Sequence, residues 1–205
     1  QTNSVIAAEA LVRWRLEDGT YLPPSSFVDI FEKNRFCSKL DFYMLKKAIQ
    51  QIRKWIDMGI NPVNISVNQS KIVFYHENYI SELKSLLEEY NVSGSYITLE
   101  VLESTVIEDI DIFNSILTEV KKLGFSVSLD DFGSGYSSLN VLSKLQIDEL
   151  KIDRIFLHTK SEVDNQRTKW ILESIIDIAK KSQILVVVEG VESKQDDLFI
   201  KNLGA

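Results

Sequence analysis

The chain has 205 residues, of which 44% are hydrophobic and 26% are charged, and its formal net charge is −7. This acidic balance argues against a DNA-, RNA- or anionic-membrane-binding surface, because such surfaces depend on basic patches. The single cysteine, Cys37, excludes an internal disulfide and a cysteine-rich zinc site. The apolar runs are too short to cross a bilayer and the length suits one domain, so we predict a single domain without direct membrane contact.

Hydrophobic periodicity predicts alternating strands and helices in the first half of the chain. We predict, in order, a strand over residues 5–14, a short helix from Ser25 or Ser26 to about residue 33, a long helix over 38–58, a strand over 63–68, a helix over 79–90 and a strand over 96–101. The long helix has an apolar stripe that we interpret as core: Leu40, Tyr43, Met44, Ala48, Ile49, Ile52, Trp55 and Ile56.

The second half repeats this alternation. We predict a helix over residues 110–123, a strand over 125–129, a helix over 139–145, a strand over 149–152, a polar connection over 160–168, a helix over 169–181 and a strand over 184–188. Alternating strands and helices are typical of a parallel sheet, and the apolar run 184–188 predicts a strand covered on both faces. No dinucleotide or phosphate-loop glycine motif is present, so an α/β barrel is favoured over an open sheet.

Polar residues recur within or at the end of these predicted strands: Glu9, Asn64, Glu100, Asp130, Asp131, Lys151 and Glu189. Functional side chains of a barrel collect at the carboxyl ends of its strands. Several buried carboxylates would be costly without cations, and carboxylate and amide oxygens suit Mg²⁺ or Mn²⁺. Two divalent ions about 4 Å apart favour in-line displacement at phosphorus, so the pattern indicates phosphodiester hydrolysis.

Each of these residues also has a structural interpretation. Asp130 and Asp131 could make a turn and cap a helix, and Lys151 could neutralise a structural carboxylate. Arg13 could be a surface arginine, and Glu103 could be an acidic residue at a helix start. The two histidines, His76 and His158, lie in polar stretches and suit surface positions.

Six motifs in order resemble those of the EAL domain family. They are Glu9-Ala10-Leu11-Val12-Arg13, Asn64-Ile65-Ser66, Glu100-Val101-Leu102-Glu103-Ser104, residues 130–139 (DDFGSGYSSL), Lys151-Ile152-Asp153 and Glu189-Gly190-Val191-Glu192. The resemblance covers essentially the whole chain. It implies a TIM-like (β/α)8 barrel and a bacterial phosphodiesterase that hydrolyses cyclic di-GMP to linear pGpG with two Mg²⁺ or Mn²⁺ ions per site.

The resemblance also implies roles for individual residues. The metal ligands would be Glu9, Asn64, Glu100, Asp130, Asp131 and Glu189, and the catalytic residues would be Lys151, Glu189 and Glu9. Lys151 would hold or help to deprotonate the attacking water. Leu11 and Arg13 would bind the substrate, and Glu103, Gly133 and Gly135 would support the glycine-containing loop.

The sequence departs from the family pattern in several places. Leu102 stands where the family usually has threonine, and Ser134 replaces the threonine of the glycine loop. The family's first strand would precede Gln1, and its last strand, with a metal-site glutamine, would follow Ala205. We therefore expect residues 1–205 to be one EAL domain, truncated at both ends and excerpted from a longer protein.

Two further readings stay open besides the enzyme. Leu102 favours a catalytically inactive EAL domain that acts as a cyclic di-GMP receptor, and the third reading is a scaffold that binds neither metal nor nucleotide. The family resemblance implies a homodimer, with sensor or cyclase domains in the full-length chain. We expect a cytoplasmic location, and absent flanking segments could anchor the full-length protein to a membrane.

Overall fold

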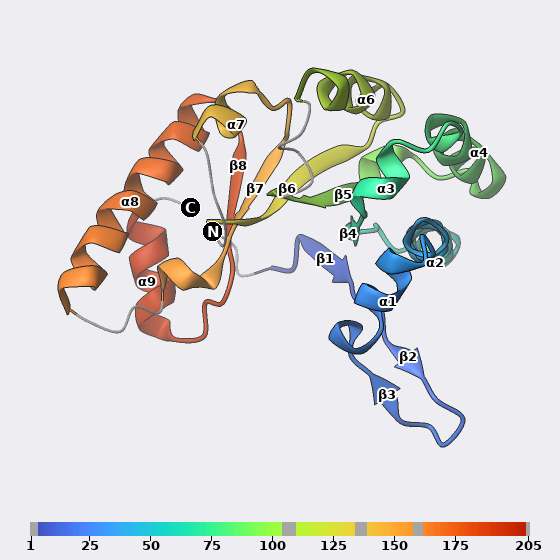
Figure 1. Ribbon diagram of the computed structural model, residues 1–205, viewed down its shortest axis with the longest axis horizontal. Helices are drawn as coiled ribbons and strands as arrows, with labels where there is room; N and C mark the ends of the chain where they lie inside the picture. The colour runs from blue at the N-terminus through green and yellow to red at the C-terminus, as the bar shows by residue number, and fades with distance from the viewer. Residues whose placement is uncertain (1–3, 104–109, 134–138, 158–161, 204–205) are drawn as a thin grey trace. The chain divides into compact units, whose positions relative to one another are not determined.

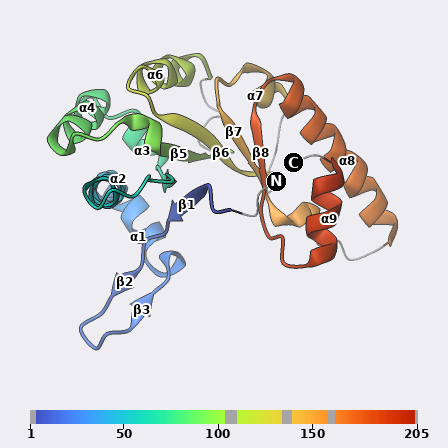
Figure 2. The same ribbon diagram turned by 180° about the vertical axis from the view of Figure 1, so that it is seen from behind.

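The computed structural model describes residues 4–103, 110–133, 139–157 and 162–203. These residues form two compact units, the first from residues up to 101 together with 115–126, and the second from 102–114 together with 127–205. Figures 1 and 2 show the elements of each unit from opposite sides. Among the described residues, no helix has the length and apolar character needed to span a bilayer.

Parallel strands and helices make up the first unit. Its strands are β1 (Ala7–Ala10), β2 (Trp14–Arg15), β3 (Tyr21–Leu22), β4 (Asn64–Asn68) and β5 (Ile97–Leu102). Its helices are η1 (Pro24–Ser26), α1 (Val28–Lys33), α2 (Cys37–Asp57), α3 (Lys71–Phe74), α4 (Tyr79–Tyr90), η2 (Gly94–Tyr96) and most of α6 (Ile110–Lys122). β4 pairs in parallel with both β1 and β5, whereas β2 and β3 form an antiparallel hairpin.

Helix α2 packs one face against other elements of the first unit. Its buried residues recur at helical spacing, and they are Cys37, Asp41, Leu45, Ala48, Ile49 and Ile52. This face contacts α3, α4 and β4. The predicted stripe is confirmed for Ala48, Ile49 and Ile52 and is wrong for Tyr43, which is 56% exposed because the packed face runs through Leu45.

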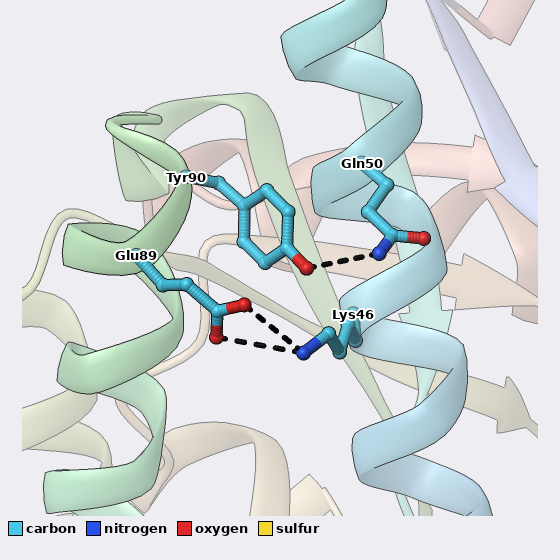
Figure 3. A network of polar contacts seen from close by, with 4 residues as sticks. All are labelled: Lys46, Gln50, Glu89 and Tyr90. Carbon is cyan, nitrogen blue, oxygen red and sulfur yellow. Dashed lines mark hydrogen bonds and ion pairs between the residues drawn. The ribbon is translucent and has the colours of Figure 1, made fainter.

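A polar network also ties α2 to α4 (Figure 3). The ammonium group of Lys46 lies 3.1 Å from a carboxylate oxygen of Glu89, and the amide of Gln50 donates to the hydroxyl of Tyr90 over 2.9 Å. The pair of Lys46 and Glu89 is exposed, and the bond between Gln50 and Tyr90 is partly buried. They therefore fix how α2 meets α4 without involving the end of β4.

The second unit repeats the strand and helix alternation. Its elements are β6 (Ser126–Phe132), α7 (Leu139–Lys144), β7 (Glu149–Ile152), η3 (Arg154–Phe156), α8 (Glu162–Lys181), β8 (Leu185–Val188) and α9 (Lys194–Leu203). β7 pairs in parallel with both β6 and β8. Helix α8 buries Leu172, Ile175, Ile176 and Ala179 at helical spacing and packs against β8.

The predicted order of strands and helices is confirmed, and the α/β class with it. The helix over residues 79–90 and the strand over 149–152 have the predicted bounds. Several features were not predicted: the β2–β3 hairpin, α3, α9 and the short helices η2 and η3. The prediction of a polar connection is wrong over residues 162–168, because α8 begins at Glu162. The first turns of this helix lack an apolar stripe, so the sequence pattern does not indicate them.

One expectation about strand burial is also wrong. The run 184–188 was expected to be covered on both faces, yet Leu185 is 68% exposed and Val187 is 39% exposed. Val186 and Val188 are only partly exposed and face the opposite way, since strand residues alternate. In the structure, β8 therefore buries one face more than the other.

Candidate functional site

A buried lysine lies at the centre of the polar residues in the second unit. Lys151 is in β7, and its ammonium group lies 3.2 Å from a carboxylate oxygen of Asp130 and 2.8 Å from one of Glu189. The side chains of Lys151 and Asp130 are only 7% and 12% exposed. Two carboxylates on neighbouring strand ends therefore hold one cation in a site that is largely shielded from water.

A β-bulge brings a third carboxylate to the same place. Adjacent strand residues normally point to opposite faces, which would separate Asp130 from Asp131. The register between β6 and β7 shifts between Leu129 and Phe132, and Asp131 has a left-handed backbone with φ of 55°. Bulges of this kind redirect side chains. One oxygen each from Asp130, Asp131 and Glu189 consequently lies within 4.8 Å of the others.

The electrostatics of this cluster favour an added cation. Burial raises the pKa of Asp131 above its usual value, and the negative charges of Asp130, Asp153 and Glu189 raise it further. Lys151 opposes this effect, but the pKa of Asp131 still stays raised. Because the ionised acids repel one another, a bound cation would stabilise their charged forms. Clustered carboxylate oxygens are the donor set that Mg²⁺ and Mn²⁺ prefer, so the residues fit the expected metal.

The first unit gathers a second set of polar groups at the ends of its strands. Glu9 in β1 lies opposite Ser66 in β4, and Asn68 lies opposite Glu100 in β5. The side-chain amide of Asn68 donates to a carboxylate oxygen of Glu9 over 2.9 Å. Glu100 is almost completely buried. The carboxyl ends of β1 and β4 thus place an amide and a carboxylate in direct contact.

Asn64, which was predicted as the amide ligand, occupies a different position. It is the first residue of β4, opposite Ala7, and therefore lies toward the amino end of the strand. Its amide oxygen accepts a hydrogen bond from Thr98 over 2.8 Å, and its amide nitrogen donates to the carbonyl of Ser95. The residue that contacts Glu9 is Asn68, which our sequence reasoning missed. The signal was present, because Asn68 ends the predicted strand and functional groups collect at that end.

The remaining predicted site residues lie near these two sets in sequence. Leu11 is 54% exposed and Arg13 is exposed, and a guanidinium nitrogen of Arg13 donates to the carbonyl of Val12. Glu103 is buried just after β5. Gly135 lies outside the described residues, as do Ser134 and the rest of residues 134–138.

Gly133 is constrained by the ring of Phe156. Its φ of +99° is a backbone conformation that favours glycine, and a Cβ atom there would lie 2.1 Å from a ring carbon of Phe156. Only glycine fits this position without displacement of the ring. The end of the Asp130-Asp131 strand is therefore held close to η3.

Parallel strands with carboxylates and a buried lysine at their carboxyl ends define an α/β protein with an acidic cluster at the strand ends. The chain belongs to the EAL domain family, because the model of the EAL domain matches residues 1–205. A likeness to solved members of the family confirms the fold. The PaMucR phosphodiesterase in complex with c-di-GMP gives a TM-score of 0.88 at 32% identity, covering 98% of this chain and 81% of that chain.

Other relatives agree. An EAL domain protein from Listeria monocytogenes gives a TM-score of 0.85 at 27% identity, covering 100% of this chain and 79% of that chain. The bifunctional diguanylate cyclase/cyclic di-GMP phosphodiesterase MucR of Pseudomonas aeruginosa is 33% identical over 98% of this chain and 29% of its own length. The cyclic di-GMP phosphodiesterase PdeR of Escherichia coli is 32% identical over 98% of this chain and 30% of its own length. The chain thus spans less than a third of each of these two relatives.

Proposed function

We propose that the chain is the catalytic domain of a metal-dependent phosphodiesterase that hydrolyses cyclic di-GMP to linear pGpG. The observation that carries this proposal is the buried Lys151 held between Asp130 and Glu189, with Asp131 in the same cluster. Family membership supports the substrate, because both MucR and PdeR are named as cyclic di-GMP phosphodiesterases. One family model spans residues 1–205, which supports the view that both units serve one domain.

The proposed metal ligands come from both sets of strand-end residues. Asp130, Asp131 and Glu189 are proposed from the second unit, and Glu9, Glu100 and Asn68 from the first, with Asn68 in place of Asn64. When bound, a pair of Mg²⁺ or Mn²⁺ ions would supply Lewis acidity for the phosphoryl oxygens and lower the pKa of water. Both metals suit an oxygen donor set of this kind.

The protein's own groups would orient the reactants and move the proton. In the proposed reaction the oxygen of water bonds to phosphorus, the bond from phosphorus to the ribose O3′ breaks, and one proton of the water ends on O3′. Lys151 would hold the water in line with the departing oxygen, since its ammonium group is fixed by two carboxylates. Glu189, whose side chain is 34% exposed, would receive the proton of the water. Glu9 is proposed as the third catalytic residue.

Substrate binding is proposed for the residues that follow β1. Arg13 is exposed and positively charged, which suits a contact with a substrate phosphate, and Leu11 offers an exposed apolar side chain beside it. Glu103, Gly133 and Gly135 are proposed to support the loop that follows β6. The close approach of the Phe156 ring supports this role for Gly133.

A turnover assay on the full-length protein tests the proposal. Incubation with cyclic di-GMP and Mn²⁺ or Mg²⁺ should yield pGpG, and Lys151→Ala should abolish the product while nucleotide binding persists. A wild-type protein that forms no pGpG with either metal would contradict the enzyme. If it still bound cyclic di-GMP, the receptor would be the correct reading, and that reading is favoured by the exposed Leu102 in place of the usual threonine.

Further proposals concern the whole protein. Because the chain spans about 30% of PdeR and MucR, we propose that sensor or cyclase domains accompany it. We also propose a homodimer and a cytoplasmic location, the latter in keeping with the single buried cysteine. Light scattering of the full-length protein would test the dimer, and cell fractionation would test the location.

A further inference from the structure

Three consecutive residues at the end of β4 each make a defined hydrogen bond. Asn68 donates through its side chain to Glu9 over 2.9 Å, and the backbone N–H of Gln69 donates to the carbonyl of Glu100 over 2.9 Å. The next residue, Ser70, turns away from the strand and toward helix α2. The segment 68–70 therefore joins the proposed metal ligands of the first unit to helix α2, which packs against β4.

Asp41, in helix α2, binds the last residue of this segment, Ser70. One carboxylate oxygen of Asp41 accepts the backbone N–H of Ser70 over 3.0 Å and the hydroxyl of Ser70 over 2.5 Å. The middle residue is held as well, because the side chain of the buried Gln69 accepts a hydrogen bond from the hydroxyl of Tyr79 over 3.1 Å. The residues after β4 are thus fixed by side chains of both α2 and α4.

A local role for Ser70 does not account for this contact. Ser70 precedes α3, and serine at such a position commonly caps the helix through its hydroxyl. Here the side chain makes no capping bond to α3, which is only four residues long. The hydroxyl donates to Asp41 instead. The bond serves the connection between α2 and the end of β4.

Asp41 occupies an unfavourable place for a carboxylate. It lies in the buried stripe of α2 between Cys37 and Leu45 and is 8% exposed. Burial raises its pKa to about 6, the charge of Glu32 adds to this increase, and the two bonds from Ser70 oppose it. The ionised group costs folding free energy that an apolar residue at this position would not. Unlike an apolar residue, the carboxylate can accept the two hydrogen bonds from Ser70.

We propose that Asp41 is a positioning residue for the metal site: by holding Ser70, it keeps Asn68 against Glu9 so that both are placed to bind a divalent cation. The proposal rests on the proposed function for the identity of the ligand. Groups that orient metal ligands from behind commonly change metal affinity about 10- to 100-fold when they are lost. The hydrogen bonds of Asp41 go to Ser70, so its effect on Asn68 and Glu9 would pass through Ser70.

A double-mutant cycle on Mn²⁺ affinity tests this role in the full-length protein without nucleotide. Asp41→Asn should weaken Mn²⁺ binding about 10-fold in calorimetric titrations. In an Asn68→Ala background, Asp41→Asn should have no further effect, because the metal ligand that Asp41 is proposed to position is gone. Ser70→Ala should resemble Asp41→Asn, and Ser70→Thr, which keeps the hydroxyl, should restore most of the affinity.

The polar network between α2 and α4 provides a matched control. Gln50→Ala removes a bond from the same helix to Tyr90 without touching the segment 68–70 (Figure 3). It should lower the melting temperature and leave Mn²⁺ affinity unchanged. If Asp41→Asn only loosened α2, its effect on affinity would match that of Gln50→Ala.

Several results would overturn the proposal. An unchanged affinity in Asp41→Asn would do so, and so would an equal loss with and without Asn68. If the wild-type protein binds Mn²⁺ without hydrolysing cyclic di-GMP, the proposed function fails and the cycle still decides the role of Asp41. If the wild-type protein binds no Mn²⁺, hydrogen exchange in the metal-free protein decides instead: Asp41→Asn must accelerate exchange at the Ser70 amide more than Gln50→Ala does.

Discussion

Replacing Lys151 with methionine removes a buried ammonium group from the acidic cluster while keeping a long side chain. Asp130 and Glu189 then lose a partner that lies 3.2 Å and 2.8 Å away, and Asp130 is 12% exposed. Breaking a buried ion pair from one side costs about 3–5 kcal/mol, since the other charge stays buried without compensation. We expect a loss of this size in metal-free protein at pH 8.

The stability lost in Lys151→Met should depend on pH, and the raised pKa of Asp131 sets the direction of that dependence. Lys151 lowers the raised pKa of Asp131, so its removal raises that pKa further. An acid whose folded-state pKa is raised destabilises the fold as pH increases through that pKa. The stability deficit of Lys151→Met should therefore shrink as the pH falls from 8 toward 3.8, the ordinary pKa of an aspartate.

Urea unfolding followed by circular dichroism, with a chelator present, measures both effects. Lys46→Met is the matched control, because Lys46 forms an exposed ion pair with Glu89 and should change stability little at either pH. If Lys151→Met behaved like Lys46→Met, or lost equal stability at pH 4 and pH 8, our account of the cluster would be refuted.

Three further predictions follow from single features. Gly133→Ala should destabilise the protein by more than about 1 kcal/mol in urea unfolding, because φ is +99° and the new Cβ would meet Phe156; Phe156→Ala should reduce that cost. Asp131→Asn should raise the melting temperature of metal-free protein at pH 8, since it removes a repelled charge, and should lower Mn²⁺ affinity in calorimetry; the opposite sign in either measurement would contradict the assignment. Asp41, with a pKa of about 6 against an ordinary value of 3.8, should make the wild-type protein lose about 2 kcal/mol relative to Asp41→Asn as pH rises from 4 to about 6.5; parallel stability curves would show that Asp41 does not titrate in this way.

Much of the fold could be predicted because its signals are local. The apolar run around Lys151 and the helical spacing over residues 79–90 each fixed an element with its bounds. The first turns of α8 carry no such spacing, so the start of that helix was missed. Asp41 was missed for a related reason, because a charged residue in a core stripe reads as a break in the stripe.

The candidate site was predictable in composition and less so in geometry. Strand alternation placed Asn64 and Asn68 on one face, but only the pairing of β4 with β1 shows which of them meets Glu9. The clustering of Asp130 with Asp131 depends on a bulge and a left-handed backbone at Asp131. No residue pattern indicates that bulge, since two adjacent aspartates equally suit a turn.

The most direct test of the central claim is anomalous diffraction from crystals of the full-length protein grown with Mn²⁺. Our account predicts anomalous peaks for Mn²⁺ within bonding distance of Asp130 and Asp131, and Mn²⁺ within bonding distance of Asn68 and Glu9. Crystals that contain ordered Mn²⁺ elsewhere and no peak at Asp130 or Asp131 would contradict it.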